Sequence, residues 1–350
     1  MAAENTPVQA ADEGLHNPED DPLWSESFYL NFSDSHGHHG GFTRMALHPT
    51  KKETEGFLCL YLPGGRIGIT RVTDALEQPK AGVIRAGNIQ HLCTDPVKQW
   101  RVRFDGELHV FEDPGLVARV LEPNSPPVTT ERLQLDLEAS GLHSPFFYPN
   151  YKKVGTPPPH KRERAGFGRK IKLALRLPGE IRLALRMRSG RHYEQSMAVR
   201  GSVTLNGRKE SFTGGGHRDH SWGLRHWGVS PRFRWLSGQM EGMAFNAMYL
   251  TVAGSNVING YVWCEGVCMP VDELRLENSF DDTGLAGRDI SLELVSGGRH
   301  FSIKGQVFLN VPLPMAGPGF STMYTVGRTR YECGGKVGYG VAEFLERLYP

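Results

Sequence analysis

Residues 214–227 read GGGHRDHSWGLRHW, and no other stretch of the chain gathers so many titratable and aromatic side chains. The fourteen residues include three histidines, two arginines, one aspartate and two tryptophans. Three glycines open the stretch and let the backbone approach another segment closely, because glycine has no Cβ atom. If residues 217–222 are extended, side-chain alternation gives two faces: Arg218, His220 and Trp222 on one, His217, Asp219 and Ser221 on the other.

Such a strand can line a pocket with one face while the other face holds the strand in place through buried hydrogen bonds. The alternative is a polar strand end whose Asp and His side chains satisfy nearby backbone groups. Under the first interpretation Asp219 and His220 are candidate catalytic residues, and Arg218 and Trp222 candidate substrate-binding residues. Arg225 either binds a substrate carboxylate or pairs with Asp219.

Alternation of apolar and polar residues surrounds this stretch on both sides. Residues 100–105 and 132–138 alternate strictly between the two kinds of side chain. This pattern indicates antiparallel strands with one face in a core and the other in water. Asp105-Gly106 and Asn206-Gly207 each lie between strand-like runs and are typical hairpin turns.

The overall pattern predicts an all-β protein built from two antiparallel β-sandwich or lipocalin-like barrel units. The chain contains 42 glycines and 23 prolines, which favours many turns and short strands over long helices. Only the end has helical spacing of apolar residues, at Val341, Phe344, Leu345 and Leu348, and there we expect one short C-terminal helix.

Three ranges follow from this reading: a disordered leader at 1–22, an N-terminal lipocalin-like domain at 23–180, and a C-terminal β domain at 181–350 that carries the 214–227 stretch. Residues 1–21 hold six acidic residues and neither Lys nor Arg, so we expect them to be solvated. A basic, proline-containing segment at 152–170 reads as a solvated loop or movable flap, and a hairpin follows it at 171–187.

Composition excludes several classes of partner. A net charge of +2 with 22% charged residues indicates neither nucleic acid nor an acidic substrate. No run of about eighteen apolar residues exists, so we expect no transmembrane segment, while peripheral contact with a membrane stays open. The N-terminus has no basic start and no apolar stretch, so we expect a cytoplasmic protein without a secretory signal. The oligomeric state is not predicted.

The sequence predicts neither a metal nor another cofactor. The five cysteines are an odd number, and without a secretory signal they are most simply free thiols. Cys264 and Cys268 lack a second pair or suitably spaced histidines for a zinc site, so we interpret them as core residues. His36, His38 and His39 lie in a glycine-rich turn where no acidic or thiol partner recurs at a ligand spacing, which favours a hairpin loop with histidines at the edge of a pocket over a metal site.

The motif RDHSWG after glycines resembles the hallmark of a bacterial family related to carotenoid 1,2-hydratases (hydroxyneurosporene synthases). The segment Glu26–Tyr29 with residues 31–34 is similar to the aromatic segment that opens the first domain in these relatives, and Gly338–Glu343 is similar to their closing segment. The resemblance implies a lipocalin-like β fold, related forms of which serve as cyclases and Diels–Alderases. His220 and Trp222 match the family's His-x-aromatic element, and Asp219 its preceding acid.

Acid–base chemistry on a hydrophobic small molecule fits these residues. Hydration or cyclisation of a polyene needs a proton donor for a carbon–carbon double bond and aromatic faces near the resulting cation. Asp219 or His220 is the predicted donor, and Trp222, Trp235 and Tyr249 form the predicted aromatic wall, with Tyr29 as a further substrate-binding residue.

One departure from the family concerns the hydration step. The hydratases also carry a Tyr-x-Asp element about twenty-five residues after the motif, but here Thr251 stands two residues after Tyr249. Two function classes therefore remain: a cofactor-free lyase or isomerase acting on an isoprenoid, steroid-like or polyene molecule, and a non-catalytic lipocalin-type protein that binds a hydrophobic ligand.

Overall fold

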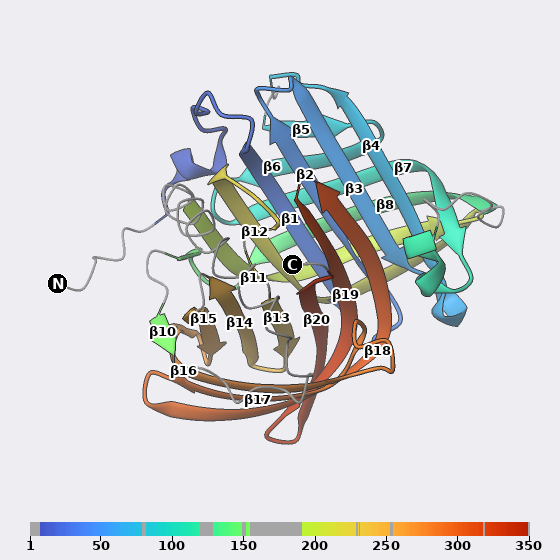
Figure 1. The fold of residues 1–350 in the computed structure, drawn as a ribbon. Helices are drawn as coiled ribbons and strands as arrows, with labels where there is room; N and C mark the ends of the chain where they lie inside the picture. The colour runs from blue at the N-terminus through green and yellow to red at the C-terminus, as the bar shows by residue number, and fades with distance from the viewer. Residues whose placement is uncertain are drawn as a thin grey trace.

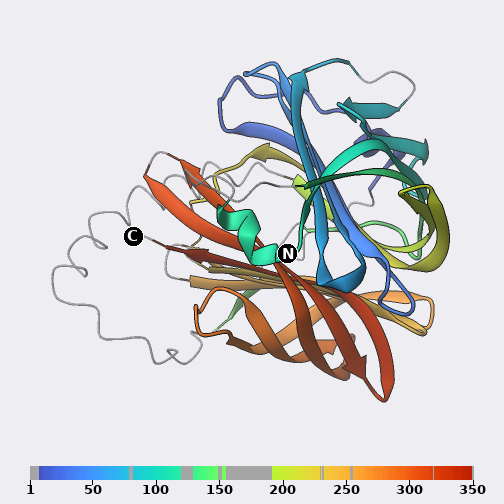
Figure 2. The same ribbon diagram turned by 90° about the vertical axis from the view of Figure 1, so that its right-hand side faces the viewer.

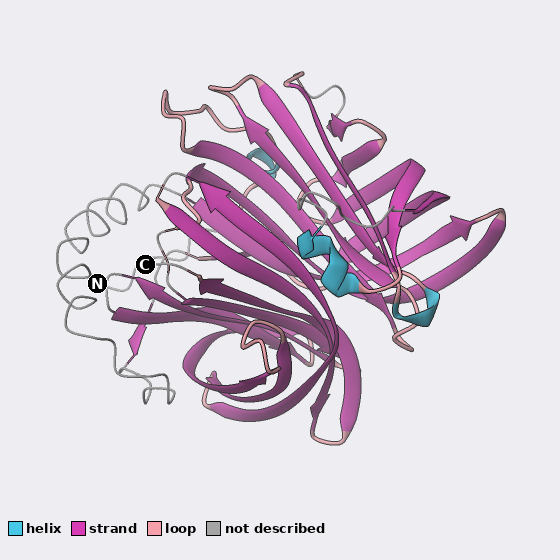
Figure 3. Cartoon of the chain, turned by 45° about the vertical axis from the view of Figure 1, so that its right-hand side comes forward, coloured by secondary structure: helices cyan, strands magenta, loops and turns pink. Residues whose placement is uncertain are grey.

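The computed structural model consists almost entirely of antiparallel strands (Figure 3). It describes residues 8–78, 82–119, 129–148, 152–154, 191–228, 230, 232–252, 255–317 and 319–348. Three short 3-10 helices are η1 (Ala10–Glu13), η2 (Pro63–Gly65) and η3 (Pro114–Arg119). No helix in the described part of the chain is long and apolar enough to span a membrane.

The first barrel is a closed ring of the strands β4, β3, β2, β1, β12, β11, β8 and β7, which ends where β7 pairs with β4 (Figure 1). Strands β6 and β5 extend the sheet beyond β7, and the short β9 pairs with β11. The bounds are β1 Trp24–Asp34, β2 Gly40–His48, β3 Glu53–Tyr61, β4 Ile67–Ala75, β5 Val83–Ala86, β6 Ile89–Asp95, β7 Gln99–Phe111, β8 Thr129–Gly141, β9 Phe146–Phe147, β11 Arg191–Leu205 and β12 Arg208–Leu224.

The second barrel is a ring of β15, β14, β13, β20, β19, β18, β17 and β16, closed by the pairing of β15 with β16. The short β10 pairs with the first part of β15, at residues 256–258. The bounds are β10 Lys152–Val154, β13 Arg232–Met240, β14 Met243–Val252, β15 Ser255–Cys264, β16 Val267–Phe280, β17 Gly287–Ser296, β18 Arg299–Gly317, β19 Phe320–Cys333 and β20 Lys336–Arg347. The two barrels lie one against the other in Figure 2.

Three apolar clusters explain this arrangement. Phe28, Leu30 and their neighbours on the inward face of the first ring fill the first barrel. Leu236, Phe245 and their neighbours fill the second. A third cluster joins the barrels, because strands β1–β4 of the first and β13, β14 and β18–β20 of the second also carry apolar residues on the faces that meet, among them Phe42, Trp235 and Val341. Among them β1, β2, β13 and β20 are buried on both faces over most of their length, which sets them apart from the alternating strands β7 and β8.

The all-β fold and its two lipocalin-like barrel units are confirmed, but the predicted C-terminal helix is wrong. Lys336–Arg347 form strand β20, which pairs with both β13 and β19. The spacing of apolar residues imitated that of a helix because both faces of β20 are buried. Val341 belongs to the cluster between the barrels, whereas Phe344 belongs to the core of the second barrel. Apolar residues on both faces of a strand produce runs that imitate helical periodicity.

The division of the chain between the two barrels does not follow the predicted ranges 23–180 and 181–350. The strand that carries the 214–227 motif belongs to the first barrel, not to the C-terminal unit, and the second barrel begins at Arg232. The boundary at 180, the hairpin at 171–187 and most of the basic segment at 152–170 lie outside the described residues. Within that segment, Lys152–Val154 form strand β10.

Most of residues 8–22 are exposed, as expected for a solvated leader, but one acidic side chain is buried. The 3-10 helix η1 places Glu13, 6% exposed, against the first barrel. Residues 1–7 lie outside the described part of the chain.

Candidate functional site

Strand β12 separates two chemically different regions. The predicted alternation of the motif is confirmed by the pairing of His220 with Phe28 and of Asp219 with Tyr29. The His220 ring stacks on Phe28 at 3.9 Å, inside the first barrel. The His217 ring lies 5.0 Å from Trp235 of the second barrel. One face of the motif therefore points into the first barrel, and the other faces the second barrel.

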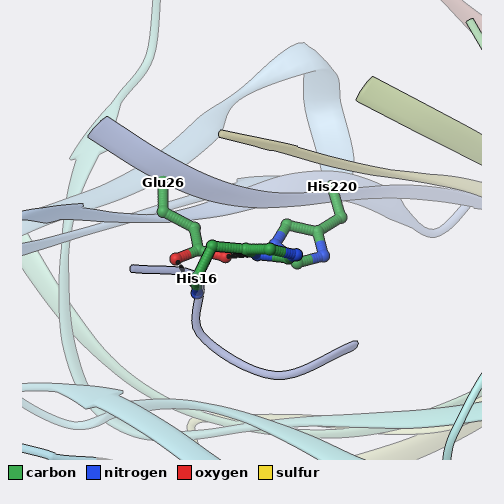
Figure 4. A group of neighbouring side chains, drawn as sticks. All are labelled: His16, Glu26 and His220. Atoms are coloured by element: carbon green, nitrogen blue, oxygen red, sulfur yellow. Dashed lines mark hydrogen bonds and ion pairs between the residues drawn. The ribbon is translucent and has the colours of Figure 1, made fainter. Parts of the chain in front are cut away.

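The inward face holds the leader. The Arg218 guanidinium donates to the Glu13 carboxylate at 2.6 and 3.0 Å, with both side chains buried. Glu26 Oε1 contacts His16 Nδ1 at 2.7 Å and His220 Nε2 at 2.8 Å, a cluster shown in Figure 4. These contacts anchor the leader in the barrel, because they join residues far apart in the sequence through charged hydrogen bonds.

The inward-facing residues of the motif therefore have a structural role, because they hold the leader against the first barrel. Trp222 stacks on the His16 ring at 3.6 Å. His220 is fully buried and its other ring nitrogen contacts the Tyr193 hydroxyl at 2.9 Å. Burial lowers the pKa of His220, against the opposing effect of Glu26. The two predicted catalytic residues, Asp219 and His220, thus lie on opposite faces of β12, and only Asp219 faces the second barrel.

The face toward the second barrel carries a chain of alternating histidine and carboxylate side chains. His192 Nε2 lies 2.9 Å from Glu194 Oε1 and 3.2 Å from Asp219 Oδ2. His217 Nε2 lies 2.7 Å from Glu194 Oε2, and Trp235 Nε1 donates to Glu194 Oε1 at 2.8 Å. The cluster thus joins β11 and β12 of the first barrel to β13 of the second.

Charge pairing fixes the protonation of this cluster. Burial alone would lower the pKa of His192, but the carboxylates of Asp219 and Glu194 outweigh burial and raise it to about 10. Burial would raise the pKa of Asp219, but the charge of His192 holds it well below its usual range. Asp219 is therefore ionised at neutral pH and has no proton to donate.

Glu343 of β20 has the opposite character. It is 5% exposed and accepts a hydrogen bond from the Tyr29 hydroxyl at 2.8 Å and another from the Tyr324 hydroxyl. Burial raises the pKa of Glu343 to about 8, although both tyrosine hydrogen bonds oppose the shift. A carboxyl group that stays protonated at neutral pH thus lies between two tyrosines at the interface of the barrels.

Arginines border this region. Arg225 donates to the Ser221 hydroxyl, and its charge contributes to the lowered pKa of Asp219, although the two do not form an ion pair. Arg44 donates from Nε to Ser27 Oγ at 3.1 Å. The Asp219 side chain is 19% exposed, so the cluster reaches solvent on this side.

The predicted aromatic wall is not a single surface. Trp222 lies inside the first barrel, Trp235 lies between the barrels, and Tyr249 packs against the core of the second barrel. The predicted substrate-binding residues that do meet at the interface are Tyr29 and Trp235, whose rings lie 5.9 Å apart in an edge-to-face arrangement. Arg218 is buried with Glu13, away from this interface.

Two cavities differ in position and size. A crevice of about 10 Å³ lies between the barrels beside Gly215, Gly216 and His217 of the motif, and Asn31 and Ser237 also line it. It has about the volume and the polar lining that one water molecule requires. A cavity of about 490 Å³ lies on the outer face of the first barrel and is lined largely by polar side chains, among them Arg103, Gln134, Ser202 and Lys209.

Two clusters in the described residues have donor sets that could hold a divalent ion. They are His16 with Glu26 and His220, and His192 with Glu194 and Asp219, and in each the ligand atoms lie within 4.8 Å of one another. In both clusters hydrogen bonds and ion pairs already join these groups. The histidines at 36–39 are not part of either cluster, and His39 pairs with Glu210 at 3.2 Å.

Sequence reasoning predicted Tyr29 but missed three residues of the site: Glu343, His192 and Glu194. Glu343 stands at the end of the Gly338–Glu343 segment, and Tyr29 at the end of Glu26–Tyr29, so both segments of the resemblance bring a residue to the site. No sequence pattern pointed to His192 or Glu194, because only the pairing of β11 with β12 places them beside Asp219.

Fold and site together define a double lipocalin-like barrel with a buried acid–base cluster between its two units. The chain belongs to the family described as Domain of unknown function (DUF7064), which matches residues 9–347. No curated protein matches the sequence.

Solved structures share this fold at low sequence identity. The crystal structure of a protein given the name AttH, from Nitrosomonas europaea, is 12% identical, with a TM-score of 0.57 and 98% of both chains covered. The structure of CghA with Sch210972 is 14% identical, with a TM-score of 0.54, and 99% of this chain and 96% of that chain are covered. At these identities the likeness concerns the fold.

Proposed function

We propose that this protein is a cofactor-free enzyme of the hydratase or cyclase type that acts on a hydrophobic isoprenoid, steroid-like or polyene molecule between its two barrels. The observation that carries the proposal is Glu343, a buried carboxyl whose pKa is raised to about 8 and which lies between Tyr29 and Tyr324. A protonated carboxylic acid in an apolar, aromatic surrounding is the group that protonation of an alkene requires.

The reaction begins when the Glu343 proton moves to one carbon of a double bond and leaves a cation on the neighbouring carbon. Aromatic faces and negative charge stabilise such a cation, and the interface offers Trp235, Tyr29 and the ionised Asp219. In hydration, water adds to the cation and returns a proton to the Glu343 carboxylate. In cyclisation, a second double bond of the substrate attacks, and loss of a proton from carbon restores Glu343.

The small crevice beside His217 supports hydration in particular. Asn31 Nδ2 lies 3.4 Å from Ser237 Oγ in the crevice wall and 3.5 Å from the Tyr29 hydroxyl, which donates to Glu343. A water molecule in this crevice would therefore be linked to the acid through side-chain hydrogen bonds.

The test uses Glu343→Gln, which keeps the size of the side chain and removes its transferable proton. Wild type, Glu343→Gln and the control Glu332→Gln, an exposed carboxylate on β19, are incubated with a panel of polyenes and isoprenoids in D₂O and analysed by mass spectrometry. Hydration adds the mass of water and leaves one deuterium on carbon, whereas cyclisation gives an isomer in which one hydrogen is exchanged for deuterium. Glu343→Gln should lower turnover by about 10²–10⁴-fold without loss of binding.

Other outcomes decide between the function classes. Full turnover by Glu343→Gln at normal stability would remove Glu343 from the chemistry. Binding of the hydrophobic ligand by the wild type without any product, across the panel, would favour the non-catalytic lipocalin-type protein. EDTA should leave turnover unchanged, and loss of activity that zinc restores would overturn the cofactor-free mechanism.

A further inference from the structure

Arg328 of β19 is a buried cation that faces the first barrel. Its side chain is 5% exposed, and its Cζ atom lies 4.7 Å from the centre of the Tyr61 ring and 5.2 Å from that of Phe308. Its Nε and Nη2 atoms have no hydrogen-bond partner among the described residues, and no described carboxylate forms an ion pair with it. A buried charge without a partner is unfavourable, so an anion bound beside Arg328 would stabilise it.

Two further donors without partners lie on the facing strands of the first barrel. The Tyr61 hydroxyl and the Ser33 hydroxyl are buried and make no hydrogen bond within the described residues. Gly40 lies between them: a Cβ atom there would be 3.0 Å from Tyr61 Cδ2 and 3.2 Å from Ser33 Oγ. Gly40 therefore packs closely against both residues, and a side chain there would also meet the Phe32 carbonyl oxygen at 2.8 Å.

We propose that Arg328, with Tyr61 and Ser33, binds the carboxylate of the substrate, so that the substrate of the proposed reaction is a hydrophobic acid. Nε and Nη2 form one edge of the guanidinium, and their two parallel N–H groups match the two oxygens of a carboxylate. A single cation balances a singly charged carboxylate. The charge of Asp34 is close enough to act on Arg328, which disfavours the additional negative charge of a phosphate.

The proposed carboxylate site at Arg328 lies close to the proton donor Glu343 on the neighbouring strand. In the pairing of β19 with β20, Arg328 is opposite Val341, and Val326 is opposite Glu343. Arg328 and Glu343 therefore occupy the same face, diagonal to each other on neighbouring strands, a relation that puts the Cα atoms about 7–8 Å apart. An acid held by Arg328 would place a double bond a few bonds from its carboxylate beside the proton donor, and would fix which double bond is protonated.

The test measures binding of cis-parinaric acid, a fluorescent polyene acid, and of its methyl ester to the full-length protein. The wild type should bind the acid more tightly than the ester by about tenfold or more, since hydrogen bonds to charged groups are the strong ones. Arg328→Met should abolish the difference while ester binding is kept, and Tyr61→Phe should reduce it. Arg330→Met, on the same strand but paired with Glu332 at the surface, is the matched control and should keep the preference.

Stability provides an independent readout. Arg328→Met removes an unpaired buried charge, so its melting temperature without ligand should equal or exceed that of the wild type. If that variant does not fold, the same test is made with Tyr61→Phe and Ser33→Ala, each of which should reduce the preference for the acid over the ester.

The proposal fails if the wild type binds acid and ester equally, if the Arg328→Met or the two hydroxyl variants keep the preference, or if decyl phosphate displaces the probe better than decanoate. It rests on the proposed function for the substrate, but the two can fail separately. Glu343→Gln should lose turnover and keep the preference for the acid, whereas loss of the preference alone would leave Glu343 in place as the proton donor.

Discussion

Asp219 and Glu343 face the same interface, yet their surroundings give them opposite protonation states. Asp219 lies 3.2 Å from the charged His192, whereas Glu343 has two neutral tyrosines as its partners. The cation lowers the pKa of the first carboxyl, and burial raises that of the second to about 8. This difference assigns the proton-donor role to Glu343 in place of the predicted Asp219.

Asp219→Asn is therefore expected to act mainly on stability. The variant leaves the His192 cation with one carboxylate fewer, and the loss of a largely buried partner costs about 1–3 kcal/mol of unfolding free energy. Chemical denaturation of wild type and variant measures it. Glu138→Gln, which breaks an exposed pair with Arg200, is the control and should cost less than about 1 kcal/mol. A large loss of turnover by Asp219→Asn at unchanged stability would return the donor role to Asp219.

At the scale of elements, one buried ion pair joins η1 to strand β12 of the first barrel. The partners, Glu13 and Arg218, are 6% and 4% exposed, and Glu13 also accepts a hydrogen bond from Trp100 Nε1 at 2.9 Å. Both charges are removed from water, so the ion pair adds little to the free energy of unfolding compared with two apolar side chains. Loss of only one partner, however, lowers that free energy strongly, because the other charge stays buried without a partner.

Glu13→Leu is expected to destabilise the protein by about 3–5 kcal/mol, because it leaves Arg218 buried and unpaired. The double variant Glu13→Leu/Arg218→Met should recover most of that loss. Thermal and denaturant unfolding of both single variants and the double variant form a double-mutant cycle. Additive losses would show that η1 and β12 are not coupled through this pair.

Sequence patterns predicted strands well where one face is polar and less well where both are buried. Alternation identified β7 and β8, and Asn206-Gly207 forms the predicted turn with φ of 49° and 81°. Asp105-Gly106, predicted as a turn by the same logic, lies in the middle of β7, since Gly106 pairs with Leu133. Strand β20 was missed because contact between barrels is a long-range property that local spacing does not contain.

The candidate site shows the same limit. The two faces of the motif follow from alternation alone, but which face meets the leader depends on residues two hundred positions away, such as Glu13. Likewise, the sequence predicted one aromatic surface formed by Trp222, Trp235 and Tyr249. The register of each strand instead places the three rings in different surroundings.

At the scale of the whole molecule, the titration of Glu343 and His192 makes stability depend on pH. The pKa of Glu343 is raised from 4.5 to about 8, so the folded state binds a proton that the unfolded state has lost, and stability falls as pH rises through this range. The pKa of His192 is raised from 6.5 to about 10, and its contribution is complete below 6.5 and lost toward 10. Both effects have the same sign between pH 6.5 and 8.

The melting temperature should therefore fall as pH rises from about 6.5 to 9, and Glu343→Gln should show a shallower fall because one of the two groups is removed. Turnover should fall above about pH 8, where Glu343 loses its proton. Thermal melts and rates across this range measure both. A melting temperature that rises over the same range would contradict the assigned protonation states.

The pairing of β1 with β12 also has a consequence for how the chain folds during synthesis. Trp24–Asp34 pair with residues 214–224, so the first ring cannot close until almost two thirds of the chain has left the ribosome. All the strands of the second ring lie within Arg232–Arg347, and its contacts are more local in sequence. Since long-range closure is slow and exposes apolar surface in the meantime, the earliest-synthesised ring is expected to be the later one to mature, and a chaperone would act on it first.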